Sequence, residues 1–270
     1  MTLTRYEQAT APELCALLGE DRHAFAVMGN ILKGMFGPVG KIVSDELRLV
    51  LCYTCPPFPG WVWLPKGASL EELQRAWALI GQELPPQMGY RINMRPELAA
   101  YILGTQEGCS LRVDTRLDAY GCENAIAPER TAPGDYYAVT EAALDLAAAW
   151  SMALSEEENL DLRPLGTHRQ EMNEFIHKKQ LFMWKTPEGE TVSMCTVSEN
   201  NGLAYVGNVY TPKAQRRRGY AASLVYQVTR ILLRQGKCPA LYVNAQNMPA
   251  AACYQKLGYR VVDQICTLGK

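Results

Sequence analysis

Three consecutive arginines and a glycine, residues 216–219, separate an apolar segment from an amphipathic one. The segment before them, 205–210, is β-prone, and Pro212 cannot continue a central strand. After Gly219, apolar residues recur at spacings of three and four up to Gly236, which predicts a helix. The first turn of a helix has backbone N–H groups without partners, and a glycine lets that backbone approach a ligand. Guanidinium groups beside it favour an anion, and a diphosphate more than a carboxylate.

The same arginines have two other interpretations. They could form the solvated start of a helix, or a patch that contacts RNA through its phosphates. A strand before them and a helix after them favour the diphosphate site.

Two motifs in this half of the chain resemble the signature of the GNAT superfamily of N-acetyltransferases. The first motif is arginine or glutamine, two residues, glycine, one residue, then glycine or alanine. Arg216, Gly219 and Ala221 match it, with Arg217 where a small residue is usual. The second motif, N-x-P-A followed by Y-x-x-L-G-F/Y, is matched by Asn247, Pro249, Ala250, Tyr254, Leu257, Gly258 and Tyr259. The resemblance covers about the last half of the chain and implies acetyl-CoA as co-substrate.

The resemblance also implies a role for each part of the site. Backbone groups at the end of the strand would bind the pantetheine arm, and the arginine turn would bind the diphosphate. Tyr254 would be the catalytic acid that protonates the departing thiolate, since a phenol of pKa about 10 and a thiol of about 8.5 are close enough for transfer. The residues expected to bind the cofactor are Val209, Tyr210, Thr211, Arg216, Arg217, Arg218, Gly219, Tyr220, Ala221 and Asn247.

Each of these roles competes with a structural one. Tyr254 could be a core aromatic on a short helix, and Asn247 could cap that helix. No general base is assigned. Glu199 and Asn208 lie near the strand that faces the acceptor in relatives, but Glu199 sits in a polar turn and is expected at the surface. A chain of waters could deprotonate the amine instead.

No metal site is expected. Cys52 and Cys55 form one CxxC pair, and a zinc site needs a second pair or histidines with ligand spacing. The pair is therefore interpreted as core cysteine. Trp61 and Trp63 alternate along a predicted strand, which places them on one packed face of a sheet.

Composition describes a globular protein. Apolar residues make up 48% and charged residues 20% of 270, and the net charge of −1 gives no general attraction to nucleic acid or membrane. No apolar run is long enough to cross a membrane, and residues 1–10 lack the pattern of a signal peptide. Nine scattered cysteines indicate mostly reduced, buried thiols, so a cytoplasmic location is expected.

The pattern of elements predicts an α/β fold of two tandem GNAT-like mixed-sheet domains. Residues 1–127 would form a degenerate GNAT-like or accessory domain, because no arginine and glycine turn follows any of its strands. Residues 127–134 read as a linker, and 134–270 would form the GNAT domain with the acetyl-CoA site. The predicted strands are 47–53, 61–64, 111–120, 135–139, 181–185, 192–197 and 205–210; the predicted helices include 12–18, 69–80, one after Pro96, 140–153 and 167–178.

The predicted function is acetyl transfer from acetyl-CoA to a primary amine by direct attack. The acceptor would be a small molecule or a peptide, with neither nucleic acid nor membrane as partner, and the protein a monomer or homodimer. The alternative is a non-catalytic acyl-CoA-binding regulatory module, which the missing base favours.

Overall fold

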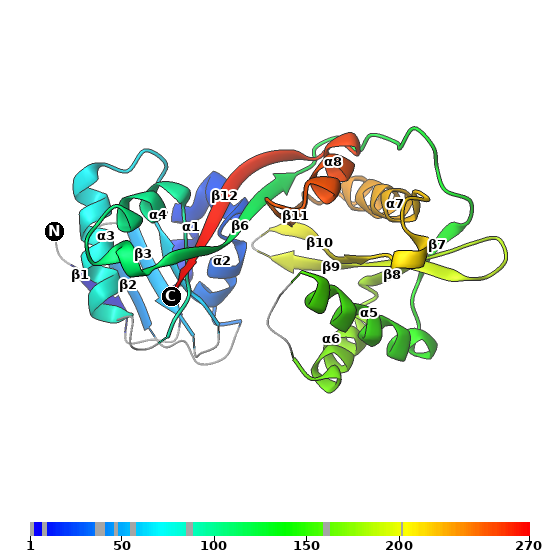
Figure 1. Ribbon diagram of the computed structural model, residues 1–270, viewed down its shortest axis with the longest axis horizontal. Coiled ribbons are helices and arrows are strands. Elements are labelled where there is room, and N and C mark those ends of the chain that lie inside the picture. The colour runs from blue at the N-terminus through cyan, green and yellow to red at the C-terminus, as the bar shows by residue number, and fades with distance from the viewer. Residues whose placement is uncertain are drawn as a thin grey trace. The chain divides into compact units, whose positions relative to one another are not determined.

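The computed structural model describes residues 3–6, 10–35, 41–45, 48–54, 58–84, 89–158, 163–200 and 202–270. By contacts the chain divides into two compact units (Figure 1). Unit 1 comprises residues 1–119, 242–247 and 261–270, and unit 2 comprises residues 120–241 and 248–260. This division differs from the predicted continuous halves because the last strand of the chain packs into unit 1.

Unit 1 contains seven strands, counted over the described residues, and four α-helices. The strands follow the order β1-β2-β3-β4-β5-β12-β6, in which β4 pairs with β5 in parallel and β1 to β4 pair antiparallel. The strands are β1 (Leu3–Tyr6), β2 (Lys41–Asp45), β3 (Leu49–Tyr53), β4 (Gly60–Trp63), β5 (Ile92–Met94), β6 (Arg112–Gly121) and β12 (Arg260–Gly269); the helices are α1 (Cys15–Leu18), α2 (Ala26–Leu32), α3 (Leu70–Glu83) and α4 (Pro96–Leu103).

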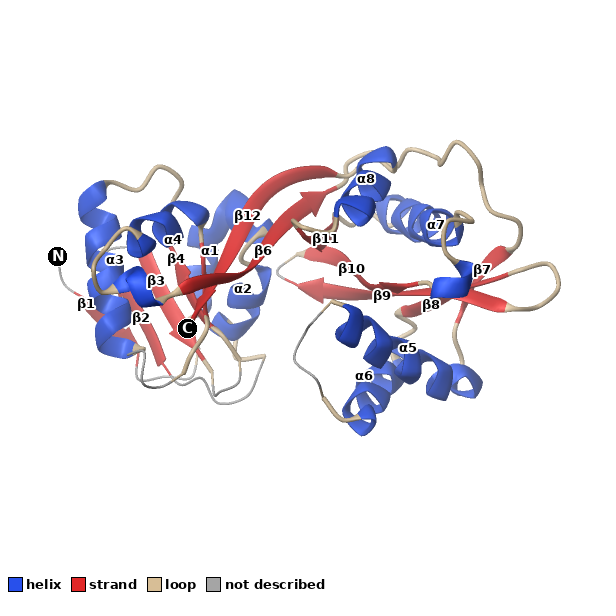
Figure 2. Ribbon diagram, in the orientation of Figure 1, coloured by secondary structure: helices blue, strands red, loops and turns tan. Residues whose placement is uncertain are grey.

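Unit 2 is built from the second half of the chain. Its strands follow the order β11-β10-β9-β8-β7, with β10 and β11 parallel and the others antiparallel. Helices α5 and α6 lie on one face of β8, β9 and β10, and α7 lies on the other (Figure 2). The elements are β7 (Asp135–Ala138), α5 (Leu144–Glu157), α6 (Leu165–His177), β8 (Leu181–Lys185), β9 (Thr191–Asn200), β10 (Leu203–Tyr210), α7 (Tyr220–Arg234), β11 (Pro239–Asn244) and α8 (Met248–Lys256).

The two halves of the chain repeat one order of elements. A strand, two helices, three strands, a helix, a strand, a helix and a strand run from β1 to β6, and the same succession runs from β7 to β12. The strand–helix–strand β4-α3-β5 in unit 1 therefore corresponds to β10-α7-β11 in unit 2. This repeat agrees with the prediction that the first half is a degenerate copy of the second.

The sheet of unit 1 is buried on both faces, and the alternation of its side chains explains how. Val43, Leu51 and Val62 pack against α3 and α4. Their neighbours Val50 and Trp61 point the other way, toward α1 and α2. Successive strand residues point to opposite faces, so a strand covered on both sides is apolar throughout.

Most predicted elements are present with shifted ends. Helix α3 runs through Gly81, where the sequence predicted its stop, because its buried face continues to Leu79, Ile80 and Glu83. Trp61 and Trp63 lie in one core cluster as predicted, and Cys52 is fully buried. Cys55 and most of the predicted loop 33–40 lie outside the described residues. Over the part that the structure describes, none of the helices has the length and apolarity to span a bilayer.

Candidate functional site

Strand β10 separates from its parallel neighbour before it ends. Its register with β11 comprises Ala204 with Pro239 and Tyr205 with Ala240. Within the described residues, 206–210 of β10 have no pairing with β11. This leaves backbone groups open toward the carboxyl end of the strand, the end at which open α/β sheets bind ligands.

A β-bulge lies in the same part of β10. The register with β9 shifts between Gly207 and Tyr210, and Asn208 has a φ of +46°. The Asn208 side chain donates to Thr196 Oγ1 at 3.1 Å, which holds the bulge against β9. Val209, on the bulge, is half-buried. A bulge re-aims the chain next to a site; contact of the Val209 backbone with a ligand stays a prediction.

The turn between β10 and α7 has an unusual backbone. Arg217 has a φ of +64° and Gly219 one of +83°, both in the left-handed region. Turns that mix left-handed and right-handed residues direct successive N–H groups into one concavity that binds anions. No side chain among the described residues caps the helix that follows, so the N–H groups of its first turn, from Tyr220 and Ala221 onward, remain available.

Gly219 permits the left-handed φ of this turn. A Cβ on Gly219 would meet Arg130 O at 3.7 Å and Ala132 Cβ at 3.9 Å, which are ordinary contacts within the protein. That the missing Cβ also lets a ligand approach the backbone stays a prediction. Tyr220 is buried, so only its backbone can face an anion.

The segment that was interpreted as a linker packs along α7 and α8. Ala132 N donates to the fully buried Ser223 Oγ at 2.8 Å, and Ile126 N donates to Leu257 O at 2.9 Å. These contacts leave a cavity of about 280 Å³ beside the first turns of α7, lined by Ile126, Ala127, Pro128, Glu129, Ala222, Cys253, Lys256 and Leu257.

The three arginines have different surroundings. Arg217 and Arg218 are exposed at the mouth of the turn. Arg216 forms an ion pair with Glu157 at 2.6 Å, and its Nε donates to Thr211 O at 2.8 Å. Sequence reasoning did not identify Glu157, because it lies 59 positions from Arg216 along the chain.

Tyr254 and Tyr259 differ in whether their hydroxyl groups have a hydrogen-bond partner. Tyr259 is buried and its hydroxyl shares a 2.7 Å hydrogen bond with Thr229 Oγ1. The rings of the two tyrosines meet edge to face at 6.1 Å. The Tyr254 hydroxyl has no hydrogen-bond partner among the described residues, and burial raises its pKa. Tyr254 is therefore protonated at neutral pH, and its hydroxyl has no acceptor within the part of the chain that the structure describes.

Asn247 belongs to a different unit from the other predicted site residues. It directly precedes α8 and its backbone N–H donates to Asn244 O at 2.7 Å. By contacts it belongs to unit 1, whereas Tyr254 and the predicted residues from Val209 to Ala221 belong to unit 2.

Glu199 is a surface residue, as expected. It is exposed, pairs with Lys237, and lies opposite Ala204 at the start of β10, away from the bulge. It is therefore not placed to act as a base.

The corresponding turn of unit 1 is closed to anions. Ser69 accepts from Glu72 N at 3.3 Å, and Glu72 Oε2 accepts from Ser69 N at 2.7 Å. This capping box uses the N–H groups of Ser69 and Glu72, whereas the start of α7 has no side-chain cap. Glu71 and Glu72 add negative charge to the first turn of α3, which repels a phosphate.

A guanidinium lies at the carboxyl ends of β4 and β5. Arg95, 4% exposed, donates through Nε to Leu64 O at 3.0 Å and pairs with Asp263 at 2.7 Å and Asp21 at 2.6 Å. It also lies over the Phe25 ring, 5.2 Å from its centroid. The register of β4 with β5 also comprises two pairs, but among the described residues Arg95 and its partners fill the carboxyl end of β4.

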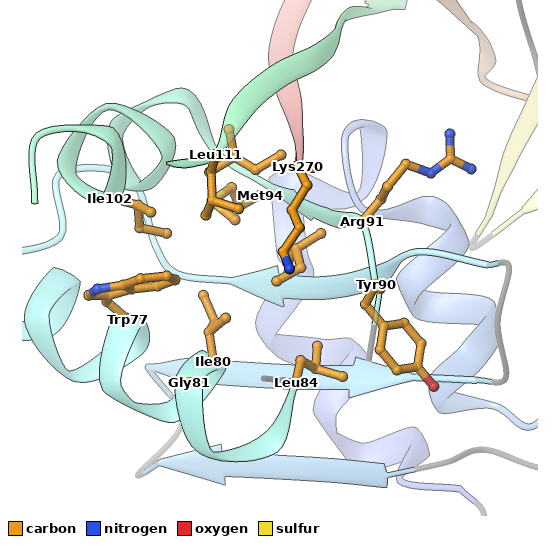
Figure 3. Close-up of a pocket in the computed structure, with 14 residues that line it drawn as sticks. Trp77, Ile80, Gly81, Leu84, Tyr90, Arg91, Met94, Ile102, Leu111 and Lys270 are labelled. Atoms are coloured by element: carbon orange, nitrogen blue, oxygen red, sulfur yellow. The ribbon is translucent and has the colours of Figure 1, made fainter. Parts of the chain in front are cut away.

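Unit 1 also has a cavity, which lies between α3, α4 and the last residues of β12 (Figure 3). Its volume is about 80 Å³, and Trp77, Ile80, Leu84 and Ile102 line it with apolar surface. An apolar cavity of about 150 Å³ can hold benzene, so this one is too small for a nucleotide. It does not compete with the turn in unit 2 as the candidate site.

No group of three or more histidine, cysteine, aspartate or glutamate side chains that could hold a metal was found in the described ranges. Eight described cysteines are free thiols.

A buried histidine between α5 and α6 should make stability depend on pH. His168 is fully buried, and its Nδ1 shares a 2.9 Å hydrogen bond with Ser151 Oγ. Burial and the nearby Arg163 lower its pKa. Above the unfolded pKa of about 6.5, His168 is neutral in both the folded and the unfolded state. Below it the unfolded state is protonated first, so the free energy of unfolding decreases as the pH is lowered.

We expect the stability lost between pH 7 and pH 5 to be smaller in His168→Gln, whose amide keeps a hydrogen bond to Ser151 and does not titrate. Urea unfolding at the two pH values measures it. An equal loss in both proteins would place the pH dependence elsewhere.

Comparison with known proteins agrees with the repeat of elements. The family model described as FR47-like protein matches residues 186–268. A search of curated protein sequences gave no match.

Several solved structures are similar over the whole chain. A GCN5-related N-acetyltransferase from Sphaerobacter thermophilus has a TM-score of 0.67 at 14% identity, covering 99% of this chain and 95% of that one. A GNAT-family acetyltransferase from Colwellia psychrerythraea has 0.63 at 14%, covering 100% of both. A tandem GNAT protein from the clavulanic acid biosynthesis pathway has 0.55 at 12%, covering 100% of this chain and 98% of that one. The predicted α/β class with tandem GNAT-like halves is thus confirmed: the chain has the fold of the GNAT acetyltransferases, and its residues 186–268 match the GNAT-related FR47-like family.

Proposed function

We propose that unit 2 transfers an acetyl group from acetyl-CoA to the primary amine of a small molecule or peptide. The observation that carries the proposal is the uncapped first turn of α7, reached through a left-handed turn at the open carboxyl end of β10. Backbone donors, the helix dipole and two exposed arginines, Arg217 and Arg218, favour a diphosphate there.

The rest of acetyl-CoA has suitable surfaces nearby. The unpaired backbone at the bulge, around Val209, suits the amide groups of the pantetheine arm, which need hydrogen-bond partners when buried. The cavity beside α7 presents apolar residues and Lys256, a combination that suits the nucleobase of CoA and one of its phosphates.

The reaction requires few groups from the protein. The amine nitrogen attacks the thioester carbonyl carbon, the carbon–sulfur bond breaks, and the thiolate takes the proton of the Tyr254 hydroxyl. The proton of the amine leaves to solvent, and the Tyr254 phenolate takes a proton back from solvent, which restores the acid for the next turnover. Holding amine and thioester together supplies much of the rate, and the acid adds to it.

Replacing Gly219 by glutamate tests the diphosphate site. The carboxylate should repel the donor, and the Kd of acetyl-CoA should rise at least ~10-fold, which is about 1.4 kcal/mol. Gly236→Glu is the matched control, because Gly236 follows the other end of α7 with a similar φ of +70° and nothing within 4 Å of its Cβ. Isothermal titration of both variants and of the unchanged protein measures the effect. Equal affinity in Gly219→Glu and the unchanged protein would remove the assignment.

A regulatory module that binds acyl-CoA without turnover is the second candidate. It is favoured by the position of Glu199, whose pairing with Lys237 at the far end of β10 takes it out of reach as a base. Release of free thiol from acetyl-CoA, followed across a panel of amines, separates the two, since a sensor binds the donor and never releases thiol.

A further inference from the structure

One carboxylate joins α5 to the turn before α7. Glu157, the last residue of α5, accepts from Arg216 Nη2 at 2.6 Å with one oxygen and from the Tyr210 hydroxyl at 3.2 Å with the other. A carboxylate that bridges two donors in this way fixes both side chains.

Arg216 is held on three sides. Its Nε donates to Thr211 O at 2.8 Å, which closes the turn on itself, and its guanidinium lies over the Tyr210 ring, 5.6 Å from the centroid. With Glu157 on Nη2, the side chain is directed back toward β10. The exposed Arg217 and Arg218 are the arginines that can face an anion at the turn.

The end of β10 is fixed from the sheet as well. Ser193 Oγ donates to Tyr210 O at 3.0 Å, and Thr211 Oγ1 donates to Ser193 Oγ at 2.9 Å. The Tyr210 ring packs against the Trp150 ring of α5, with 5.9 Å between the ring centroids. These contacts hold the strand end, and the hydrogen bond from Arg216 Nε to Thr211 O links it to the turn.

The bridging carboxylate is charged at neutral pH. Desolvation acts to raise its pKa, but the hydrogen bond and charge of Arg216, with smaller effects of Tyr210 and Lys213, hold the pKa of Glu157 below its ordinary value. The pair therefore persists across the pH range in which an acetyltransferase would be assayed.

We propose that Glu157 is a positioning residue for donor binding. It holds Arg216 against Thr211 O and so keeps the turn in the left-handed shape that opens the N–H groups of α7. Arg216 then serves the diphosphate through the shape of the turn, and not through its side chain as the motif implies. The inference rests on the proposed function, because the donor it concerns is acetyl-CoA.

Glu157→Gln tests the role. The amide loses the charge and one acceptor, so we expect the Kd and KM for acetyl-CoA to rise about 5-fold to 10-fold, the range of one charge-assisted hydrogen bond weakened but not abolished. The kcat at saturating acetyl-CoA should change less than about twofold, because the reacting groups are untouched. Glu156→Gln is the matched control: Glu156 is the preceding residue of the same helix, carries the same charge and is exposed.

A double-variant cycle provides the second measurement. Arg216→Gln alone should weaken acetyl-CoA binding as Glu157→Gln does, and the double variant should be no weaker than either, since both remove one interaction. Additive losses, an unchanged Kd, or tighter binding by Glu157→Gln would overturn the inference. Failure of the unchanged protein to bind acetyl-CoA would instead end the proposed function. Equal melting temperatures of the variants exclude unfolding as the cause.

Discussion

Tyr254→Phe should lower kcat for acetyl transfer about 100-fold, the lower end of the range for a lost general acid. The departing thiolate would then take its proton from water. Acetyl-CoA affinity should change less than about twofold, because the hydroxyl is used in the chemical step and not to hold the donor. Steady-state kinetics with a thiol-reactive dye and titration of acetyl-CoA give the two quantities.

Tyr259→Phe is the matched control for this experiment. It removes the same atom from a neighbouring ring, but that hydroxyl is bound to Thr229. The loss should cost roughly 1 kcal/mol of stability and leave kcat unchanged. Similar kcat values for Tyr254→Phe and the unchanged protein would show that the thiolate needs no acid, or that another residue supplies it.

Arg95→Met should lower the free energy of unfolding of unit 1 by about 3 to 5 kcal/mol, as expected when one partner of a buried ion pair is removed. Asp21 would be left without its cation, and among the described residues Asp263 would keep only Lys66, whose Nζ lies 3.6 Å away. Desolvation of Arg95 lowers its pKa, but the hydrogen bonds and charges of the two aspartates outweigh it and raise the pKa. The guanidinium is therefore always charged in the folded state.

Two further variants separate the effect on stability of uncompensated buried charges from the effect of losing an arginine side chain. Arg112→Met removes a pair with Asp114 in which Arg112 is 76% exposed, and such a pair contributes about 1 kcal/mol or less. Adding Asp21→Asn and Asp263→Asn to Arg95→Met should recover much of the stability, since no uncompensated charge remains. Denaturant unfolding measures all of them; a loss below about 1 kcal/mol in Arg95→Met would mean that water reaches the aspartates.

Local patterns predicted the parts of the site that local sequence determines. The apolar spacing after Gly219 predicted α7, and the apolar, β-prone run at 205–210 predicted β10. The glycine was identified, but its left-handed φ was not predicted, because that conformation is set by the turn as a whole.

Features that depend on partners far away in the sequence could not be predicted from it. The bulge at Asn208 arises from the register between β10 and β9, which no spacing within β10 reveals. Arg216 finds Glu157 across 59 positions, and Arg95 finds Asp263 across 168. Strand β12 was not predicted; it pairs with β5, a strand of 3 residues that lies far from it in the sequence.

The position of β12 has a consequence for biosynthesis. Strand β5 pairs with Cys266, Thr267 and Leu268, so a core strand of unit 1 is translated after all of unit 2. Domains made early usually fold while the ribosome continues, but this one must wait with the β5 edge of its sheet open. A nascent chain stalled before β12 should therefore bind holdase chaperones through its first half, however complete its second half is.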